Sequence, residues 1–230
     1  MNELTLLLKN SALFCDLAPE TIENRLLPLG VMQEYTKGSY LIMPQERLEN
    51  FGFVVSGLIH TTHISIDGVQ RIMDAYESGD IYGADLMCTR SRISPYHAVA
   101  AQPSRVLFFP VSMVLEPGFL EEGDQNRIIR RLLTLIAHEN MRKDYRLAIL
   151  SQKGLRERIM TYLTMQAGKR GTAAFSIPFS RDELASFLCV NRSALSHELS
   201  LMRRAGIIAC RKNTFTLLHQ EEGEGNAVEG

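Results

Sequence analysis

Residues 179–218, FSRDELASFLCVNRSALSHELSLMRRAGIIACRKNTFTLL, constrain the fold more than any other part of the chain. Ser180 and Glu183 have the S-x-x-E spacing of a capping box, which predicts the start of a short helix. After a turn at Val190-Asn191, Asn191 can cap a second helix that ends at Gly206. The hairpin pattern IIACRKNTFTLL follows. Two short helices, a tight turn and a hairpin predict a winged helix-turn-helix.

The second of these helices has an apolar face and a polar face. Leu195, Leu199 and Met202 are spaced i, i+4, i+7 and are expected to be buried. The opposite face carries short hydroxyls, an imidazole and guanidinium groups, without the Glu/Lys pairs that usually solvate a helix. Such side chains can hydrogen-bond to base edges and phosphates. The predicted DNA-binding residues are Ser180, Asn191, Arg192, Ser193, Ser196, His197, Arg203, Arg211 and Lys212.

The charge distribution supports contact with a polyanion. Residues 1–150 hold 14 basic and 18 acidic side chains, whereas residues 151–212 hold 11 basic and 4 acidic ones. A basic C-terminal module next to a mildly acidic body is typical of a nucleic-acid-binding protein. Glu198 departs from the pattern of the second helix, because its position is normally apolar in such helices; an ion pair with Arg203 or Arg204 is expected.

Residues 31–110 have a different character. Short apolar runs alternate with glycine and Asx turns, and FVVSGLIHTTHISIDGVQRIMDAY predicts three strands with a hairpin turn at 66–69. The spacing of about 8–12 residues between turn signals predicts a small antiparallel barrel or jelly roll. Helices are expected around residues 3–13 and 19–27 before it, and a helix over 155–168 after it.

Residues 124–150 lack glycine and proline and show a heptad seam. A seam of this length predicts a long helix that pairs with the same helix of a second copy, and Asn140 can fix the register of such a pair. The alternative is a helix that packs only on its own barrel. The predicted dimer-interface residues are Ile129, Leu133, Ile136, Asn140, Lys143 and Leu147, with Leu150 ending the seam.

Several classes of protein are excluded or disfavoured. No apolar run approaches the ~20 residues that span a bilayer, and the N-terminus has no pattern of a secretory signal. The four cysteines, Cys15, Cys88, Cys189 and Cys210, are scattered, which argues against a disulfide framework, a metal site and an iron–sulfur cluster. A cytoplasmic protein without a metal or other cofactor is expected.

In the order of its modules, the chain resembles the Crp/Fnr superfamily of bacterial transcription regulators over nearly its whole length. The segments that carry the resemblance are YTKGSYLIMPQE, FVVSGLI, GDIYGADL and SRDELASFLCVNRSALSHEL. The resemblance implies an α+β fold with an N-terminal cyclic-nucleotide-binding-like β-roll, a long dimerisation helix and a C-terminal winged helix-turn-helix. The expected domains are a β-roll at 1–123, a dimerisation helix at 124–150, a DNA-binding domain at 151–220 and a disordered acidic tail at 221–230.

The departures from the family pattern concern the effector. Members that bind cyclic AMP have a Glu where this chain has Ala84, and an Arg-Ser pair where it has Pro95-Tyr96. A phosphate without its guanidinium is poorly stabilised, so cyclic AMP is not expected. Cys15 alone does not form the cysteine cluster of the oxygen-sensing branch, and His60, His63 and His97 are weak candidates for haem ligands. By family position, the expected effector residues are Tyr82, Ala84, Asp85, Tyr96, His97, Asn140 and Met141.

The sequence therefore predicts a homodimeric transcription regulator, not an enzyme, that binds a pseudo-palindromic double-stranded operator and responds to a small molecule other than cyclic AMP. RNA polymerase is a further candidate partner, and no membrane contact is expected. The second helix of the motif, the recognition helix, has Ser193 and His197 where the family often has Glu and Arg. The DNA half-site that Glu and Arg usually read is therefore not expected. Two alternatives remain: a ligand-independent DNA-binding protein with a degenerate roll as its dimerisation scaffold, and an enzyme that uses the barrel, with Asp85 near His97, as its active site.

Overall fold

The computed structural model describes residues 2–64, 68 and 70–218. Two compact units are present, residues 1–145 and residues 146–230, and the boundary between them falls inside one long helix, α5 (Glu122–Ser151). This helix begins two residues before and ends one residue after the 124–150 segment. The predicted turn at 66–69 and the predicted acidic tail at 221–230 lie wholly or largely outside the described residues.

The first unit opens with short helices. The expected helix over 3–13 is shorter in the structure, because α1 (Glu3–Lys9) ends at Asn10 and residues 11–16 form turns. The Lys9 ammonium donates hydrogen bonds to the carbonyl oxygens of Cys15 and Leu17, which holds these turns against α1. The second expected helix is divided into α2 (Pro19–Thr21), η1 (Ile22–Leu26) and η2 (Leu27–Leu29).

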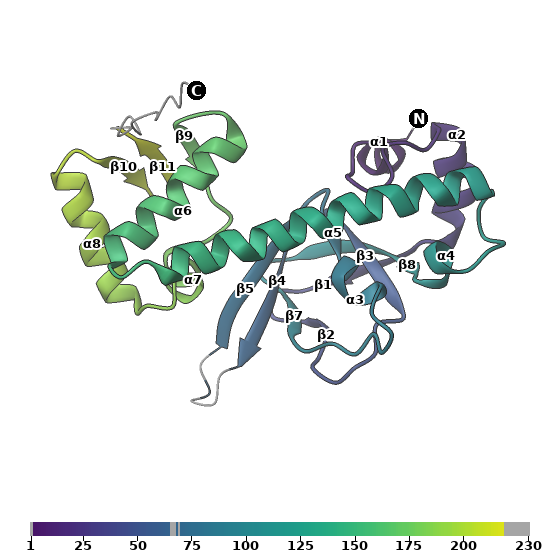
Figure 1. Cartoon of the computed structure of the whole chain (residues 1–230), viewed down its shortest axis with the longest axis horizontal. Coiled ribbons are helices and arrows are strands. Elements are labelled where there is room, and N and C mark those ends of the chain that lie inside the picture. Colours follow the sequence, from purple (N-terminus) through teal and green to yellow (C-terminus); the bar gives the residue numbers. More distant parts are fainter. Residues whose placement is uncertain (1, 65–67, 69, 219–230) are drawn as a thin grey trace, which may run out of the picture. The chain divides into compact units, whose positions relative to one another are not determined.

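The β-roll consists of two antiparallel four-stranded sheets, as the spacing of turns predicted (Figure 1). One sheet has the order β1-β8-β3-β6, with β1 (Val31–Tyr35), β8 (Ser104–Pro110), β3 (Asn50–Ser56) and β6 (Ile81–Tyr82). The other has the order β2-β7-β4-β5, with β2 (Tyr40–Ile42), β7 (His97–Ala100), β4 (Leu58–Ile64) and β5 (Gln70–Glu77). Two short helices, α3 (Ala84–Met87) and α4 (Ser112–Leu115), complete the roll.

The chain passes from one sheet to the other at Gly57, between β3 and β4. Gly57 has φ +97°, and a Cβ there would lie 2.6 Å from the Cα of Ser104. Both the backbone conformation and the close approach therefore require glycine. The Ser104 hydroxyl accepts a hydrogen bond from the Leu58 N–H at 3.1 Å, which fixes the crossing point.

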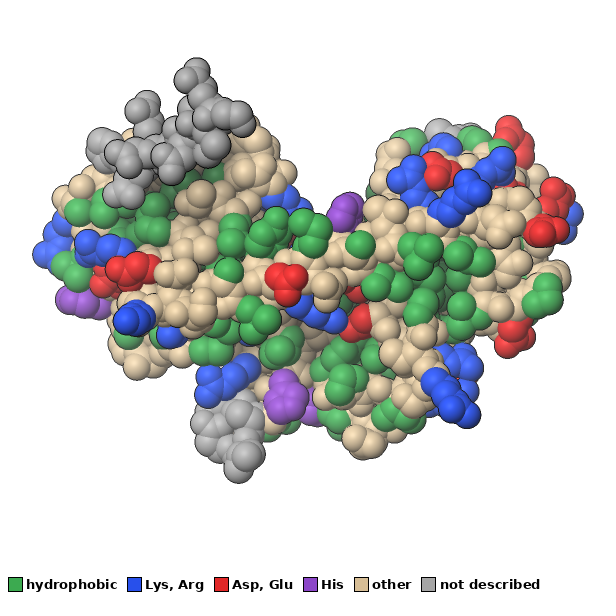
Figure 2. Space-filling model, in the orientation of Figure 1, with side chains coloured by type: hydrophobic (Ala, Val, Ile, Leu, Met, Phe, Trp, Pro, Cys, Tyr) green, Lys and Arg blue, Asp and Glu red, His purple; other side chains and the backbone are tan. Residues whose placement is uncertain are grey.

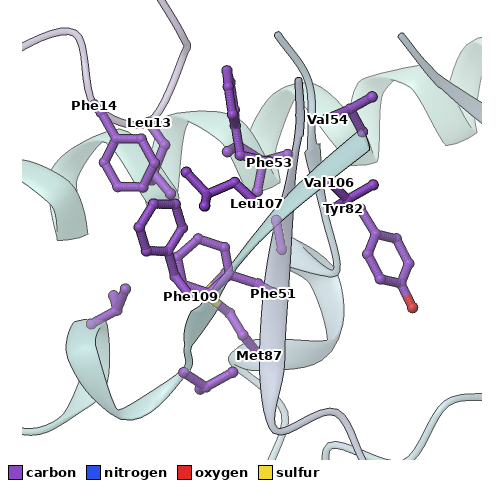
Figure 3. Close-up of a cluster of buried hydrophobic side chains, with 14 of the residues drawn as sticks. Leu13, Phe14, Phe51, Phe53, Val54, Tyr82, Met87, Val106, Leu107 and Phe109 are labelled. Carbon is purple, nitrogen blue, oxygen red and sulfur yellow. The ribbon is translucent and has the colours of Figure 1, made fainter. Parts of the chain in front are cut away.

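The core of the roll is aromatic (Figure 3). Phe14, Phe51 and Phe109 are fully buried, and the ring centroids of Phe14 and Phe109 lie 5.5 Å apart in an edge-to-face arrangement. On the roll-facing side of α5, Ile128 and Leu132 are buried in the same cluster. The N-terminal half of α5 is therefore part of the roll's own core. In Figure 3 the Tyr82 hydroxyl points away from the phenylalanine rings.

The second unit is a winged helix-turn-helix. Its elements are α6 (Leu155–Arg170), β9 (Ala174–Ser176), α7 (Arg181–Phe187), α8 (Arg192–Arg204), β10 (Ile208–Arg211) and β11 (Thr214–Leu217). The strands form one antiparallel sheet in the order β10-β11-β9. The prediction that the helix over 155–168 stops at Gly168 is wrong, because Gly168 lies inside α6. The left-handed cap is Gly171, at φ +65°.

Candidate functional site

The helix-turn-helix is fixed by the two caps that the sequence predicted. The Ser180 hydroxyl accepts from the Glu183 N–H at 3.4 Å, and the Glu183 carboxylate accepts from the Ser180 N–H at 2.7 Å. The Asn191 side chain accepts from the Ala194 N–H at 2.7 Å and starts α8. Leu195, Leu199 and Met202 are buried, as predicted from their spacing. The caps fix where the two helices begin, and the burial of these three side chains determines which residues of α8 face outward.

The outward face of α8 is polar and basic, and Figure 2 shows Lys, Arg and His side chains gathered there. Of the predicted DNA-binding residues on this helix, Arg192, Ser193, His197 and Arg203 are exposed and Ser196 is half-buried. The Arg192 guanidinium lies 3.4 Å from an Asp182 carboxylate oxygen. Because both side chains are about two-thirds exposed, this pair is weak and leaves Arg192 available to another acceptor.

The hairpin of β10 and β11, which we call the wing, is held at its tip by a hydrogen bond from α7. Arg211 and Lys212 are exposed there, and Lys212 has φ +53° in the two-residue turn between β10 and β11. The Arg181 guanidinium donates to the Lys212 carbonyl oxygen at 3.0 Å and lies 5.5 Å from the centroid of the Phe215 ring. Arg181 therefore joins the first helix of the motif to the wing. Sequence analysis did not single it out, although it directly follows the capping residue.

The prediction that Glu198 pairs with Arg203 or Arg204 is wrong. Glu198 accepts from the Arg156 guanidinium of α6 at 2.7 Å. The carboxylate is mostly covered, with 18% of its side chain exposed, and this bridge ties the recognition helix to α6. Glu198 can occupy a position that is normally apolar in such helices because the Arg156 guanidinium pairs with its carboxylate.

The exposed face of α5 carries most of the predicted dimer residues. Leu133 and Leu147 are 65% and 66% exposed, and Ile129 is 36% exposed. Asn140 is also exposed. We call these four residues the α5 stripe. The three apolar side chains of the stripe lie along one helix face and are not covered by the described part of this chain.

Two predicted seam residues make contacts within their own unit. Ile136 is half-buried and packs against the core of the roll. The Lys143 ammonium lies 3.5 Å from an Asp85 carboxylate oxygen. Both therefore sit at the edge of the α5 stripe, between its exposed centre and the face that packs on the roll.

The expected effector residues are brought together only in part. The Tyr96 hydroxyl donates to Asp85 at 2.9 Å, and Ala84 and Tyr82 are buried beside them in the roll. His97 lies on the opposite face of β7 from the buried Ala98 and Ala100. It is half-buried there, and its ring centroid is 5.5 Å from that of Tyr40. Asn140 and Met141 are exposed rather than turned to the roll.

Other residues of α5 face the roll at this point. Glu139 is 4% exposed, and the Arg142 guanidinium lies 3.5 Å from both its Oε1 atom and the Asp74 Oδ2 atom. The same guanidinium is 5.7 Å from the centroid of the Tyr76 ring. Sequence analysis missed these residues, although Ile128, Leu132, Leu135 and Glu139 have the 4, 3, 4 spacing of a second helix face.

We call this group the tyrosine site and define it as Tyr76, Tyr82, Asp85, Tyr96 and Glu139. The ring centroids of Tyr76 and Tyr82 are 6.1 Å apart in an edge-to-face arrangement. Burial raises the pKa of all three phenols well above their usual value, so these tyrosines are neutral hydrogen-bonding groups. Burial, followed by the nearby Asp85 carboxylate, raises the pKa of Glu139 to about 7.

This raised pKa predicts a pH-dependent stability. Because the folded state favours the protonated Glu139, its contribution to the free energy of unfolding is greatest below about pH 4.5 and is lost as pH rises through about 7. Glu139→Gln should lack this decline. Denaturant unfolding between pH 5 and 8, at fixed protein concentration, measures it. Glu34→Gln, at an exposed position, should follow wild type; parallel curves for wild type and Glu139→Gln would contradict the assignment.

Both units match models of known protein families. A cyclic nucleotide-binding domain model matches residues 32–116, and a Crp-like helix-turn-helix domain model matches residues 157–222. Electron transport regulator A of Shewanella oneidensis is 22% identical over 191 residues, which cover 81% of this chain and 74% of that protein. Nitrogen fixation regulation protein FixK of Azorhizobium caulinodans is 24% identical over 196 residues, covering 83% and 76%.

Solved structures show the same fold. FixK2 from Bradyrhizobium japonicum aligns with a TM-score of 0.69 at 20% identity, over 83% of this chain and 93% of that one. The c-di-GMP responsive regulator CLP of Xanthomonas campestris aligns with a TM-score of 0.69 at 16% identity, over 88% and 100%. A β-roll of this type followed by a long helix and a winged helix-turn-helix defines a DNA-binding transcription regulator. The chain belongs to the Crp/Fnr superfamily.

The four cysteines are divided between the two units. Cys15 and Cys88 belong to the first unit, and Cys189 and Cys210 to the second; all four are free thiols. No group of three or more His, Cys, Asp or Glu side chains that could hold a metal ion occurs in the described ranges. None of the helices described is long and apolar enough to cross a membrane.

Proposed function

We propose that this regulator is a cytoplasmic homodimer that binds a pseudo-palindromic operator and responds to a small molecule other than cyclic AMP. The observation that carries the proposal is the α5 stripe, because an uncovered apolar helix face next to a DNA-binding unit favours pairing with a second copy. Two recognition helices would then enter successive major grooves, with half-sites about 34–36 Å apart.

The proposed division of labour follows the modules. Residues 1–123 would bind the effector, residues 124–150 would form the dimer, and residues 151–220 would bind DNA. RNA polymerase is proposed as a further partner of the DNA-bound regulator. Binding in the roll would shift the packing of paired α5 helices, and the segment 151–154 would reorient the DNA-binding units. Ser151 ends α5 and Leu155 starts α6, so this segment is the natural place for such a change.

The residues at the family's ligand positions argue against a cyclic nucleotide. The position of the ribose-binding Glu holds Ala84, and the phosphate-binding Arg-Ser pair is replaced by Pro95 and Tyr96. Tyr96 instead donates to the Asp85 carboxylate. A cyclic phosphate would approach carboxylates without a dedicated guanidinium, which is unfavourable in a buried site. An uncharged or aromatic molecule suits the three phenol rings better.

Calorimetry tests the choice of effector. Titration of the full-length protein with micromolar cyclic AMP is expected to give no binding heat. The double variant Pro95→Arg with Tyr96→Ser, which restores the family's phosphate-binding pair, is the matched comparison and should bind cyclic AMP more tightly than wild type. Micromolar affinity in the wild-type protein would overturn this part of the proposal.

A second measurement tests whether there is an effector at all. Operator affinity measured with and without small molecules from a cell extract should change by roughly 5-fold or more, the usual range of allosteric coupling. An affinity that no extract fraction alters would favour a ligand-independent regulator whose roll serves only as a dimerisation scaffold.

A further inference from the structure

The turn of the wing has a backbone conformation that lysine does not favour. Arg211 pairs with Thr214 across the hairpin, so Lys212 and Asn213 form a two-residue turn. Lys212 has φ +53°, in the left-handed region that glycine or asparagine usually occupies in such turns. A residue with a long side chain keeps this conformation only where its surroundings enforce it. Neighbouring groups must therefore hold the turn.

Both residues of the turn are held from the segment that leads into the helix-turn-helix. The Asn213 side-chain amide donates to the Ile177 carbonyl oxygen at 3.1 Å, and the Ile177 N–H donates to the Asn213 carbonyl oxygen at 2.9 Å. The Arg181 guanidinium donates to the Lys212 carbonyl oxygen at 3.0 Å. Arg181 is thus a side chain that holds the strained residue itself.

The Arg181 side chain is itself held in place. Its guanidinium lies 5.5 Å from the centroid of the Phe215 ring, which is 1% exposed. The residue is half-buried and is the first of α7, directly after the Ser180 cap. A cation over an aromatic ring is favoured where water is partly excluded. The hydrogen bond to Lys212 is therefore made by a preorganised group and not by a freely moving surface side chain.

We propose that Arg181 is a positioning residue for DNA binding, which holds the wing turn so that the exposed Lys212 ammonium meets a backbone phosphate. The inference rests on the proposed function, because it takes Lys212 as a phosphate contact. Glycine would adopt the turn conformation without strain, so a lysine at this position indicates a use for its side chain. A turn that is ordered before binding loses less entropy when the ammonium meets DNA. Arg181 therefore contributes to DNA affinity through Lys212.

A double-variant cycle tests the inference. The affinity of the full-length protein for a mixed-sequence DNA duplex is measured over a salt series for Arg181→Met, Lys212→Ala and the double variant. Methionine keeps an apolar stem that can pack on Phe215 but has no N–H donor. Each single variant should weaken binding by roughly 3- to 10-fold and reduce the magnitude of the salt slope by about 1 per protomer. The double variant should match Lys212→Ala within about 2-fold, because no ammonium is left to position.

The opposite result is additivity. If Arg181 binds a phosphate itself, the double variant should lose both contributions, with the salt slope reduced by about 2 per protomer. General damage to the DNA-binding unit would also weaken the Lys212→Ala protein further. Either form of additivity overturns the inference, as does a Lys212→Ala protein that binds the duplex like wild type.

A second measurement follows the turn without DNA. Backbone amide order parameters of Lys212 and Asn213, measured by NMR relaxation, should fall in Arg181→Met, because the turn loses a restraint. Unchanged order parameters would contradict the positioning role. The matched control is Lys169→Met, which removes an exposed cation of α6 and should leave affinity, salt slope and order parameters unchanged. Because the duplex has no selected sequence, a protein that selects no palindromic operator would refute the proposed function and leave this inference standing.

Discussion

Leu133→Asp is expected to convert the regulator into a folded monomer whose operator affinity is roughly 100-fold or more below wild type. Leu133 is 65% exposed within its own chain, so the substitution leaves the core of the roll intact. In a paired helix seam, the same side chain would place two uncompensated carboxylates at the interface. Loss of the second DNA-binding unit removes the effective concentration that two linked half-site contacts provide. Sedimentation and operator titration measure the two effects.

The matched control is His138→Asp, an equal introduction of negative charge at an exposed position of α5 outside the α5 stripe. It should remain dimeric and bind operator normally. Ile136 is a poorer choice for this test, because it packs against the core of the roll and its replacement would also lower the stability of the monomer. A Leu133→Asp protein that sediments as a dimer would refute the assigned interface.

Arg192→Ala is expected to weaken operator binding by about 1–3 kcal/mol and to relax the preference at one base pair in each half-site. Arg192 is the first residue of α8, and its guanidinium is exposed apart from a weak contact with Asp182. The N-terminal end of a recognition helix is the part that meets base edges. A two-pronged guanidinium suits the paired acceptors of guanine.

Lys212→Ala provides the comparison. Lys212 lies at the tip of the wing, where a side chain meets the DNA backbone, so its removal should weaken binding to all sequences about equally. The slope of log affinity against log salt should decrease in magnitude by about 1 for each phosphate that the variant no longer neutralises. Affinities of both variants for the operator and for single-base substitutions, measured over a salt series, separate the two roles. If Arg192→Ala keeps the wild-type sequence preference, the placement of the recognition helix is wrong.

The DNA-binding unit was predicted well because its signals are local. The Ser180 and Asn191 caps and the spacing of Leu195, Leu199 and Met202 each depend on residues within one or two turns of a helix. The same reasoning failed at Gly168, because a glycine inside a helix was taken as the end of that helix. The residue that caps α6 is Gly171, three residues later. It also failed at Glu198, because its partner Arg156 is 42 residues away in sequence.

The proposed effector site was harder to predict, because its residues depend on which face of α5 meets the roll. The helix has two apolar faces, and the heptad pattern drew attention to the exposed one. Glu139 and Arg142 belong to the other face, where their surroundings are set by β5 and α3 rather than by neighbouring residues. Asn140 and Met141 were assigned by family position and lie one or two residues away from the side chain that is buried.

The most direct test of the central claim, that two copies of this regulator read one operator together, is selection of bound fragments from a random DNA pool with the full-length protein. The account predicts an enriched two-fold symmetric motif whose half-sites are separated by one helical turn, about 10–10.5 base pairs from centre to centre. Enrichment of a single unpaired half-site, or of no sequence at all, would contradict it.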